Sequence, residues 1–286
     1  MSAADNGGAV GEAPIAGLPS TLALRRDGAV LHITLNRPET RNAMSLQMVY
    51  ELRRALVDAE AAGDLRVIVL RGAGGHFCAG ADLRDMAAAR ARNAERGVDA
   101  GGDDAIAELS AAFGALCVAY AATGLATVAL VEGTVMGGGF GLACVTDVTI
   151  AGDNAVFRLP ETSLGVVPAQ IAPFLVERLG YSEARRLAVT GGQLDARSAH
   201  ALRLVHEVHP SGALDHALAR VLAQIQRGAP GSIAATKALI GKARFSAPGA
   251  LVDEAARVFS QAVQGAEGVE GTTAFLEKRP PKWAPG

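Results

Sequence analysis

The sequence predicts an α/β fold over about its first 212 residues, followed by a region built only from helices. Before residue 212, short apolar runs of strand length alternate with longer segments whose apolar residues recur at helical spacing, and beyond it the strand-like runs stop. With 286 residues, 50% of them hydrophobic and 20% charged, the chain has material for a large core. This composition excludes a disordered, a collagenous and a small disulfide-stapled protein.

The first expected element is a β-hairpin. Apolar and polar residues alternate over residues 31–35, as they do in a strand with one buried face. Residues 22–26 form the expected partner strand, across a turn at Asp27-Gly28. The sequence therefore predicts two antiparallel strands at the beginning of the sheet.

Helices and buried strands are expected to alternate after the hairpin. From Ser45 the apolar residues recur on one helical face as far as Gly63, which predicts a helix between these two residues. Short apolar runs over residues 67–70, 127–131 and 145–151 predict buried strands. Strand pairs separated by helices indicate an α/β sheet.

One uncharged stretch, residues 110–131, is long enough to span a bilayer, which takes about 20 helical residues. Thr123 and Gly124 divide it into an alanine-rich, helix-like half and a strand-like half over residues 127–131. We therefore expect a buried helix followed by a buried strand, and no association with a membrane.

The chain is expected to divide into three parts. Residues 1–19 are rich in alanine, glycine and proline and lack the basic and apolar regions of a signal peptide, so we expect a disordered tail. Residues 20–212 are expected to form the core with the active site. Residues 213–286 are expected to form several helices, with a break near Pro248-Gly249.

Charge and cysteine content limit the possible partners. The formal net charge of -2 provides no overall field for nucleic acid, so an anionic ligand needs a local cluster of arginine and lysine. Cys78, Cys117 and Cys144 are an odd number and lack metal-ligand spacing, which favours a reducing, cytoplasmic location without a metal site. We expect all three cysteines in the core.

Two glycine-rich loops are each expected to join a buried strand to a helix. Residues 72–83 and 133–141 contain small residues that let a ligand approach the N–H groups of a helix N-terminus. Taken alone, the first loop is more simply explained as a tight strand-to-helix connection. The second loop lacks the Gly-Lys-Ser/Thr and G-x-G-x-x-G patterns of phosphate-binding loops. Together the loops can supply two converging donors to an enolate or a tetrahedral oxyanion.

Four segments in order resemble the enoyl-CoA hydratase/isomerase (crotonase) superfamily, over nearly all of residues 21–283. They are residues 36–45, 76–86, 133–147 and 157–168. The resemblance implies a spiral of ββα units and a C-terminal helical region that mediates formation of a homotrimer, commonly as a hexamer of two trimers. It also implies an acyl-CoA thioester as the substrate and no separate cofactor, because coenzyme A is part of that substrate.

By this resemblance the catalytic site uses two backbone donors and one carboxylate. Ala81 and Gly138 match the oxyanion-hole positions, whose N–H groups hold the thioester carbonyl. Glu161 matches one of the two glutamates of typical hydratases, whereas Gly141 stands where the other is expected. A carboxylate that faces an apolar acyl pocket has a raised pKa, which suits general acid–base chemistry. In an arbitrary protein, a glutamate that follows a proline is more simply the exposed start of a helix.

The resemblance also implies a set of contacts to coenzyme A. These are Arg37, Arg41, Ala43, Ala79, Asp82, Leu83, Arg84, Phe275 and Lys278. Arg41 and Arg84 are favoured for the phosphates, and Phe275 and Lys278 are expected on the adenine side. An exposed position remains the alternative for each arginine. Asp82 and Asp147 are expected to hold loops by hydrogen bonds, and Arg158 either meets an acyl carboxylate or projects to solvent.

The expected reaction is hydration of a branched 2-enoyl-CoA with Glu161 as the single acid–base group. Residues 162–174 resemble the 3-methylglutaconyl-CoA and isohexenylglutaconyl-CoA hydratases, whose members include chains with glycine at the position of Gly141. One alternative is a Δ3,Δ2-enoyl-CoA isomerase, because a single carboxylate can move a proton from C2 to C4. An inactive CoA-binding scaffold is the second alternative. The acyl pocket depends on residues 86–105, which we expect to be mobile.

Overall fold

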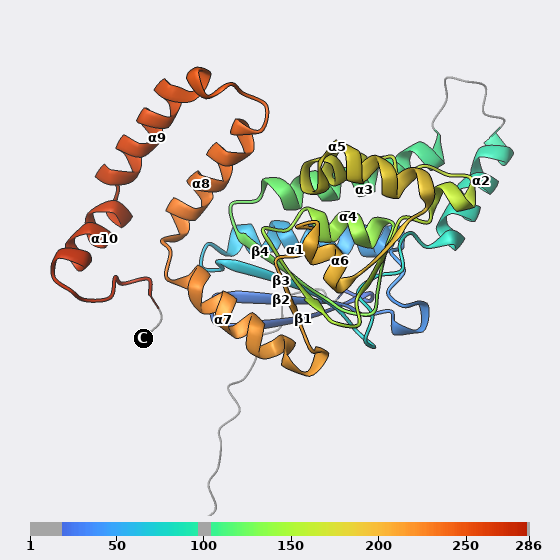
Figure 1. Ribbon diagram of the computed structural model, residues 1–286, viewed down its shortest axis with the longest axis horizontal. Coiled ribbons are helices and arrows are strands. Elements are labelled where there is room, and N and C mark those ends of the chain that lie inside the picture. The colour runs from blue at the N-terminus through green and yellow to red at the C-terminus, as the bar shows by residue number, and fades with distance from the viewer. Residues whose placement is uncertain (1–18, 97–103, 285–286) are drawn as a thin grey trace, which may run out of the picture.

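The computed structural model describes residues 19–96 and 104–284 (Figure 1). The expected N-terminal tail lies outside the described residues except for Pro19, as do residues 97–103 of the segment expected to be mobile. The first part of that segment is helical, because α2 covers Leu83–Arg96.

The main sheet has six strands in the spatial order β1-β2-β3-β4-β6-β9. They are β1 (Leu22–Asp27), β2 (Val30–Leu35), β3 (Val67–Gly72), β4 (Ala126–Val131), β6 (Val148–Gly152) and β9 (Glu207–His209). β1 and β2 are antiparallel and the other neighbours are parallel. The predicted hairpin is confirmed, since Asp27 pairs with Val30 and Gly28 takes the positive φ of 55° that this turn requires.

The remaining strands form a second, smaller sheet, and helices connect the strands of the two sheets. The strands are β5 (Thr134–Met136), β7 (Val156–Arg158) and β8 (Gln193–Asp195), in the order β5-β7-β8. The short or connecting helices are η1 (Pro38–Thr40), α4 (Gly138–Cys144), η2 (Glu161–Leu164), α5 (Ala172–Thr190), α6 (Ala196–Ala201) and η3 (Ser211–Ala213). The strand predicted over residues 145–151 begins later, because Val145 ends α4 and the strand starts at Val148.

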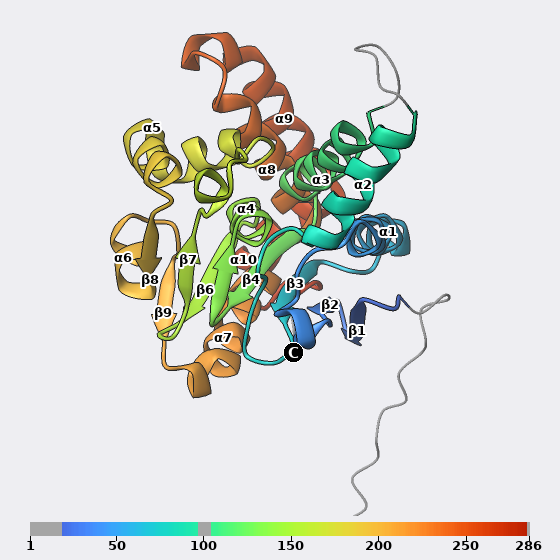
Figure 2. The same ribbon diagram turned by 90° about the vertical axis from the view of Figure 1, so that its right-hand side faces the viewer.

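Helices cover both faces of the main sheet, with α1, α3, α4 and α5 on one side and α7 (Leu214–Gln226) on the other (Figure 2). Because strand side chains alternate, Ile68 and Leu70 join the core on the α1 side, whereas Val67 and Val69 pack with α7. Burial on both faces explains why β4 is buried along its whole length and is apolar apart from Thr127.

The predicted helix after Ser45 is confirmed as α1 (Leu46–Ala62). The Ser45 side chain accepts a hydrogen bond from the N–H of Met48 at 3.2 Å, as an N-cap residue does. Gly63 ends the helix in the left-handed conformation, with φ 73°.

Within the described residues, α3 (Ala105–Ala122) is the one helix whose length and hydropathy would let it cross a membrane. In the structure it packs against α1 and α2. Tyr120 is fully buried, and its hydroxyl donates to the carbonyl of Leu52 at 3.2 Å. The buried strand predicted after it is confirmed as β4, but the helix itself is buried on one face only, since Val118 is 59% exposed.

The C-terminal region is helical, as predicted, with α8 (Pro230–Ala243), η4 (Pro248–Leu251), α9 (Val252–Gln264) and α10 (Ala266–Leu276). The predicted break near Pro248 is confirmed at η4. Figure 1 shows α8, α9 and α10 extending from the body of the molecule. Lys237 attaches α8 to that body, because its ammonium donates to the carbonyl of Leu125 and to Asp147, each at 2.6 Å.

Candidate active site

Two glycine-rich loops lie side by side beyond the carboxyl ends of the parallel strands β3 and β4. The N–H of Cys78 donates to the carbonyl of Thr134 at 3.0 Å, and the N–H of Met136 donates to the carbonyl of Cys78 at 2.9 Å. An ideal Cβ on Gly80 would lie 3.7 Å from the Cα of Gly137. The two loops that were predicted separately are therefore brought into direct contact.

The backbone around Ala81 is held while its own N–H stays available. The N–H of Met44 donates to the carbonyl of Gly80 at 2.7 Å, and the N–H of Asp82 donates to the carbonyl of Met44 at 2.9 Å. Across the described part of the chain, the N–H of Ala81 has no acceptor. The first loop thus presents one fixed, unused donor.

Gly138 provides a second donor of the same kind. It is the first residue of α4, where N–H groups have no partner within the helix. The preceding Gly137 has φ 47° and ψ -118°, a conformation open to glycine, and its N–H donates to the carbonyl of Arg158 at 3.1 Å. The N–H of Gly138 has no acceptor among residues 19–96 and 104–284. Ala81 and Gly138 therefore form a pair of unused donors on adjoining loops.

Glu161 brings a carboxylate to the same loops. It starts η2 after β7 and is half-buried, and its Oε1 would lie 2.9 Å from an ideal Cβ on Gly137. Its Oε2 is buried and has no hydrogen-bond partner in the described chain. Desolvation by burial raises the pKa of Glu161 above the usual range of a glutamate. An unpartnered, half-buried carboxylate beside two free N–H donors can accept a proton from a bound molecule.

The thiol of Cys78 is not a nucleophile in this site. Cys78, Cys117 and Cys144 are all buried and free, as predicted. Desolvation by burial raises the pKa of each of the three thiols to about 12. They are protonated at neutral pH and act as small apolar core residues.

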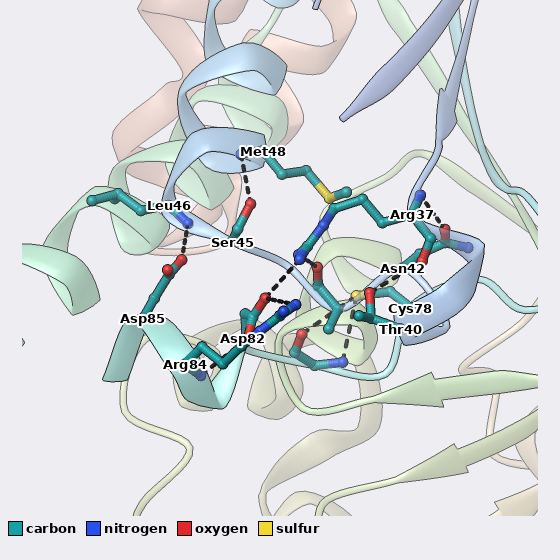
Figure 3. A network of polar contacts seen from close by, with 12 residues as sticks. Arg37, Thr40, Asn42, Ser45, Leu46, Met48, Cys78, Asp82, Arg84 and Asp85 are labelled. Atoms are coloured by element: carbon teal, nitrogen blue, oxygen red, sulfur yellow. Dashed lines mark hydrogen bonds and ion pairs between the residues drawn. The ribbon is translucent and has the colours of Figure 1, made fainter. Parts of the chain in front are cut away.

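Arg37 and Asp82 form a nearly buried ion pair beneath the first loop (Figure 3). The guanidinium of Arg37 donates to Asp82 at 2.8 Å and to the carbonyl of Ala43 at 2.6 Å. Burial raises the pKa of Asp82, but the hydrogen bonds from Arg84 and Arg37 outweigh it and lower that pKa to about 2. Asp82 therefore holds the loop through hydrogen bonds, as predicted, and Arg37 serves the same network.

Asp82→Asn is expected to reduce the free energy of unfolding by about 1.5–3 kcal/mol at pH 7, because it removes the charge that Arg37 needs. Since folding lowers the pKa of Asp82, its contribution is complete above the ordinary pKa of 3.8 and is lost as the pH falls towards about 2. Urea unfolding at a series of pH values measures the difference. Asp27→Asn, in the exposed pair with Arg25, is the control and should change stability by less than about 1 kcal/mol. An undiminished difference between the Asp82 variant and the parent at pH 3 would contradict this explanation.

Arg41 lies in a loop attached to the first glycine-rich loop. Arg41 and Asn42 both have left-handed φ angles, 51° and 58°, which are uncommon outside glycine. The amide of Asn42 stabilises this conformation by donating to the carbonyls of Ala73 and His76 at 2.9 and 2.7 Å. The N–H of Ala79 donates to the carbonyl of Arg41 at 3.0 Å.

The structure brings most of the predicted CoA contacts together and leaves two apart. Arg37, Arg41, Ala43, Ala79, Asp82, Leu83 and Arg84 lie on the joined loops or at the start of α2. The side chain of Arg84 is 71% exposed there. Phe275 is 83% exposed and lies with Lys278 at the end of α10, on the side of the molecule opposite α2 (Figure 1).

Phe113 and Ile171 are two residues near the site for which the sequence predicts no role. Ile171 belongs to the segment that carried the branched-chain resemblance, but the sequence does not indicate what its side chain contacts. Phe113 lies in the uncharged part of α3, where apolar spacing alone predicts core packing. Both side chains lie against the glycines of α4.

Comparison with known proteins places nearly all of the chain in one family. A family model described as enoyl-CoA hydratase/isomerase matches residues 25–285. The chain is 32% identical over 268 residues to the 2,3-dehydroadipyl-CoA hydratase of Escherichia coli strain K12, covering 92% of this chain and 98% of that protein. It is 31% identical over 262 residues to the mevalonyl-coenzyme A hydratase of Aspergillus fumigatus, covering 90% of this chain and 92% of that protein.

Solved structures agree with this result. AtuE of Pseudomonas aeruginosa is similar with a TM-score of 0.88 and 52% identity, covering 93% of this chain and 100% of that one. An enoyl-CoA hydratase/isomerase from Marinobacter aquaeolei is similar with a TM-score of 0.87 and 48% identity, covering 93% of this chain and 99% of that one. The predicted crotonase-like α/β fold with a helical C-terminal region is confirmed.

Proposed function

Because the chain belongs to the enoyl-CoA hydratase/isomerase family, we propose that this hydratase acts on a branched 2-enoyl-CoA of the glutaconyl type, with Glu161 as its single acid–base group. The observation that carries the proposal is the buried, unpartnered Oε2 of Glu161 beside the free N–H groups of Ala81 and Gly138. Hydration of a conjugated thioester needs donors that hold its carbonyl oxygen and a group that moves the protons, and these three groups can fill both roles.

The two N–H donors hold the thioester carbonyl oxygen. When water adds to C3, negative charge moves to this oxygen and an enolate forms. Fixed donors stabilise that charge more than they stabilise the neutral carbonyl, and each is typically worth about 2.7–4 kcal/mol of the barrier. The hydrogen bonds around Ala81 and the helix start at Gly138 fix both donors in advance.

Glu161 moves the protons. Its carboxylate takes one proton from the water as the oxygen forms its bond to C3 and the C2=C3 double bond becomes an enolate. The resulting carboxylic acid returns the proton to C2, which regenerates the thioester and leaves a 3-hydroxyacyl-CoA. A raised pKa suits a group that must both accept and donate a proton near neutral pH.

Two features of the sequence support the branched, carboxylate-bearing acyl group. Residues 162–174 resemble the branched glutaconyl-CoA hydratases, and position 141 carries glycine in place of the second glutamate. The Escherichia coli relative is also named for a dicarboxylic acyl group. We propose that the carboxylate of the substrate helps to orient the water in place of the missing side chain.

Δ3,Δ2-Isomerisation is the second candidate, because Gly141 leaves one protein carboxylate and isomerisation needs only one. Loss of absorbance at the conjugated-thioester band, measured with 3-methylglutaconyl-, isohexenylglutaconyl- and crotonyl-CoA, tests the choice. Hydration of a branched glutaconyl ester with little turnover of crotonyl-CoA is the expected result. Full activity on crotonyl-CoA would refute the role of the substrate carboxylate. Conjugation of a 3-enoyl-CoA without a hydroxyacyl product would identify an isomerase.

We also propose that Arg41 and Arg84 contact the phosphates of coenzyme A. Because Phe275 and Lys278 lie on the side opposite α2, we expect them to reach the adenine only across the interface of a homotrimer or a hexamer. Arg41→Ala is expected to raise KM by about 3–10-fold and to leave kcat unchanged, as loss of an exposed charge contact does. The exposed Arg25, on β1, is the control position. An unchanged KM in Arg41→Ala would exclude this contact.

A further inference from the structure

The space beside Gly141 is filled by another side chain. An ideal Cβ on Gly141 would lie 2.1 Å from Cγ2 and 2.9 Å from Cβ of Ile171, which is closer than real Cβ atoms approach. Gly141 lies in α4 without a positive φ, so its backbone conformation does not require glycine. Glycine is required here because of the contact with Ile171.

Ile171 is fixed in this place by its neighbours. It is 3% exposed and precedes α5, where its carbonyl accepts from the N–H of Leu175 at 2.9 Å. The adjacent Gln170 lies over Gly114 of α3, where an ideal Cβ would come within 2.1 Å of its Oε1. The Gln170 amide also donates to the hydroxyl of Ser110 at 3.1 Å. Ile171 is therefore fixed by its own hydrogen bond to α5 and by the contacts of the adjacent Gln170 with α3.

Phe113 completes an apolar surface on the same face of α4. Its ring Cζ would lie 3.3 Å from an ideal Cβ on Gly138 and 3.8 Å from one on Gly141. Residues three apart lie on one helix face, so Phe113 covers both glycines. Glu161 lies at the start of α4 and Ile171 lies one turn further along. One turn after the donor at Gly138, this face of α4 is therefore covered by apolar side chains. In a typical hydratase the second glutamate would project from this position.

We propose that Ile171 is a specificity-determining residue, which with Phe113 forms an apolar wall that contacts an alkyl branch at C3 of the acyl group. This inference rests on the proposed function and deepens it. Gly141 and Ile171 are then a complementary pair, since the glycine admits the side chain that replaces the second carboxylate. One methylene group in an apolar pocket typically changes kcat/KM by about 10–200-fold, so the wall favours a branched substrate over its unbranched analogue.

A mutant cycle at positions 141 and 171 tests the packing. Gly141→Ala is expected to lower Tm by about 2–10 °C, because an added methyl group overpacks the contact. In an Ile171→Gly background the same change is expected to cause no loss, since the obstructing atoms are gone. Gly241→Ala, in α8 with nothing within 4 Å of its ideal Cβ, is the matched control and should not lower Tm in either background. Equal losses from Gly141→Ala in both backgrounds would overturn the proposed pair.

Substrate preference tests the wall separately. The ratio of kcat/KM for 3-methylglutaconyl-CoA to that for unbranched glutaconyl-CoA is expected to fall about 10-fold or more in Ile171→Ala, mainly through KM of the branched ester. Ile171→Val keeps the branched Cβ and should retain most of the preference. An unchanged ratio in an active Ile171→Ala enzyme would overturn the inference while leaving the proposed function intact. If the parent enzyme hydrates neither ester, the proposed function fails and this inference fails with it, even where the Tm cycle shows the expected packing.

Discussion

Glu161→Gln is expected to reduce kcat by about 10²–10⁴-fold, because the amide cannot take a proton from water or return one to C2. The acyl-CoA should still bind, since the donors at Ala81 and Gly138 belong to the backbone. Stopped-flow or steady-state absorbance of the conjugated thioester measures turnover, and calorimetry measures binding of the product. Glu183→Gln, on α5 where Glu183 pairs with Arg186, is the control and should retain activity. Retained turnover in Glu161→Gln would remove Glu161 from the mechanism.

The pH dependence of kcat/KM in the parent enzyme should also reflect the ionisation of Glu161. Burial raises the pKa of Glu161, and only the ionised form accepts a proton from water. The rise of kcat/KM with pH should therefore have its midpoint above the usual range of a glutamate. This limb should be absent from the residual activity of Glu161→Gln. A midpoint at or below the usual range would show that the carboxylate is solvated in the free enzyme.

The stability of the folded protein is expected to fall as the pH rises, whereas kcat/KM is expected to rise. Because the folded-state pKa of Glu161 is raised, the folded protein binds this proton more strongly than the unfolded chain does, and stability is lost as the pH rises through that pKa. Glutamine carries no charge, so Glu161→Gln should raise Tm at pH 8 and leave it nearly unchanged at pH 4. Thermal unfolding at the two pH values measures this difference. A lower Tm for the variant at pH 8 would contradict the desolvation argument.

An ester in place of the backbone amide at Ala81, introduced as lactic acid, is expected to reduce kcat by about 10²–10³-fold, because it removes one donor to the enolate oxygen. The change keeps the methyl side chain and the chain geometry. The ester also makes the carbonyl of Gly80 a weaker acceptor for the N–H of Met44, whereas the bond from the N–H of Asp82 to Met44 is unaffected, so Tm should fall only slightly. Turnover of the branched glutaconyl ester and thermal unfolding are the two measurements.

The matched control is the same replacement at Ala247. Its N–H also has no acceptor in the described chain, and it precedes η4 in the C-terminal region, away from the glycine loops. It should leave kcat unchanged. Glycolic acid in place of Gly138 removes the other donor, and the two effects should not be additive, since both act on one oxygen. Equal losses of kcat at Ala81 and Ala247 would show that the Ala81 effect is unspecific.

Local signals account for the elements that the sequence predicts well. The hairpin at Asp27-Gly28 and the helix from Ser45 to Gly63 depend on turn and capping residues within a few positions of each other. The short strands β5, β7, β8 and β9 were not predicted, because three residues carry too little periodicity. Their pairing depends on partners from distant parts of the chain.

The amino-acid sequence was enough to predict the order of the longer strands and helices up to β6, but not β5 or η1. It was also enough to predict the two glycine loops, the helical C-terminal region and, through ordered motifs, the family. Three features became visible only in the folded chain: Glu161 is desolvated beside Gly137, Arg37 pairs with Asp82, and Ile171 fills the space at Gly141. The difference comes from the distance along the chain over which each effect acts. Periodicity and capping act between near neighbours, whereas burial, pKa and the space around a side chain depend on residues that only the completed packing brings together.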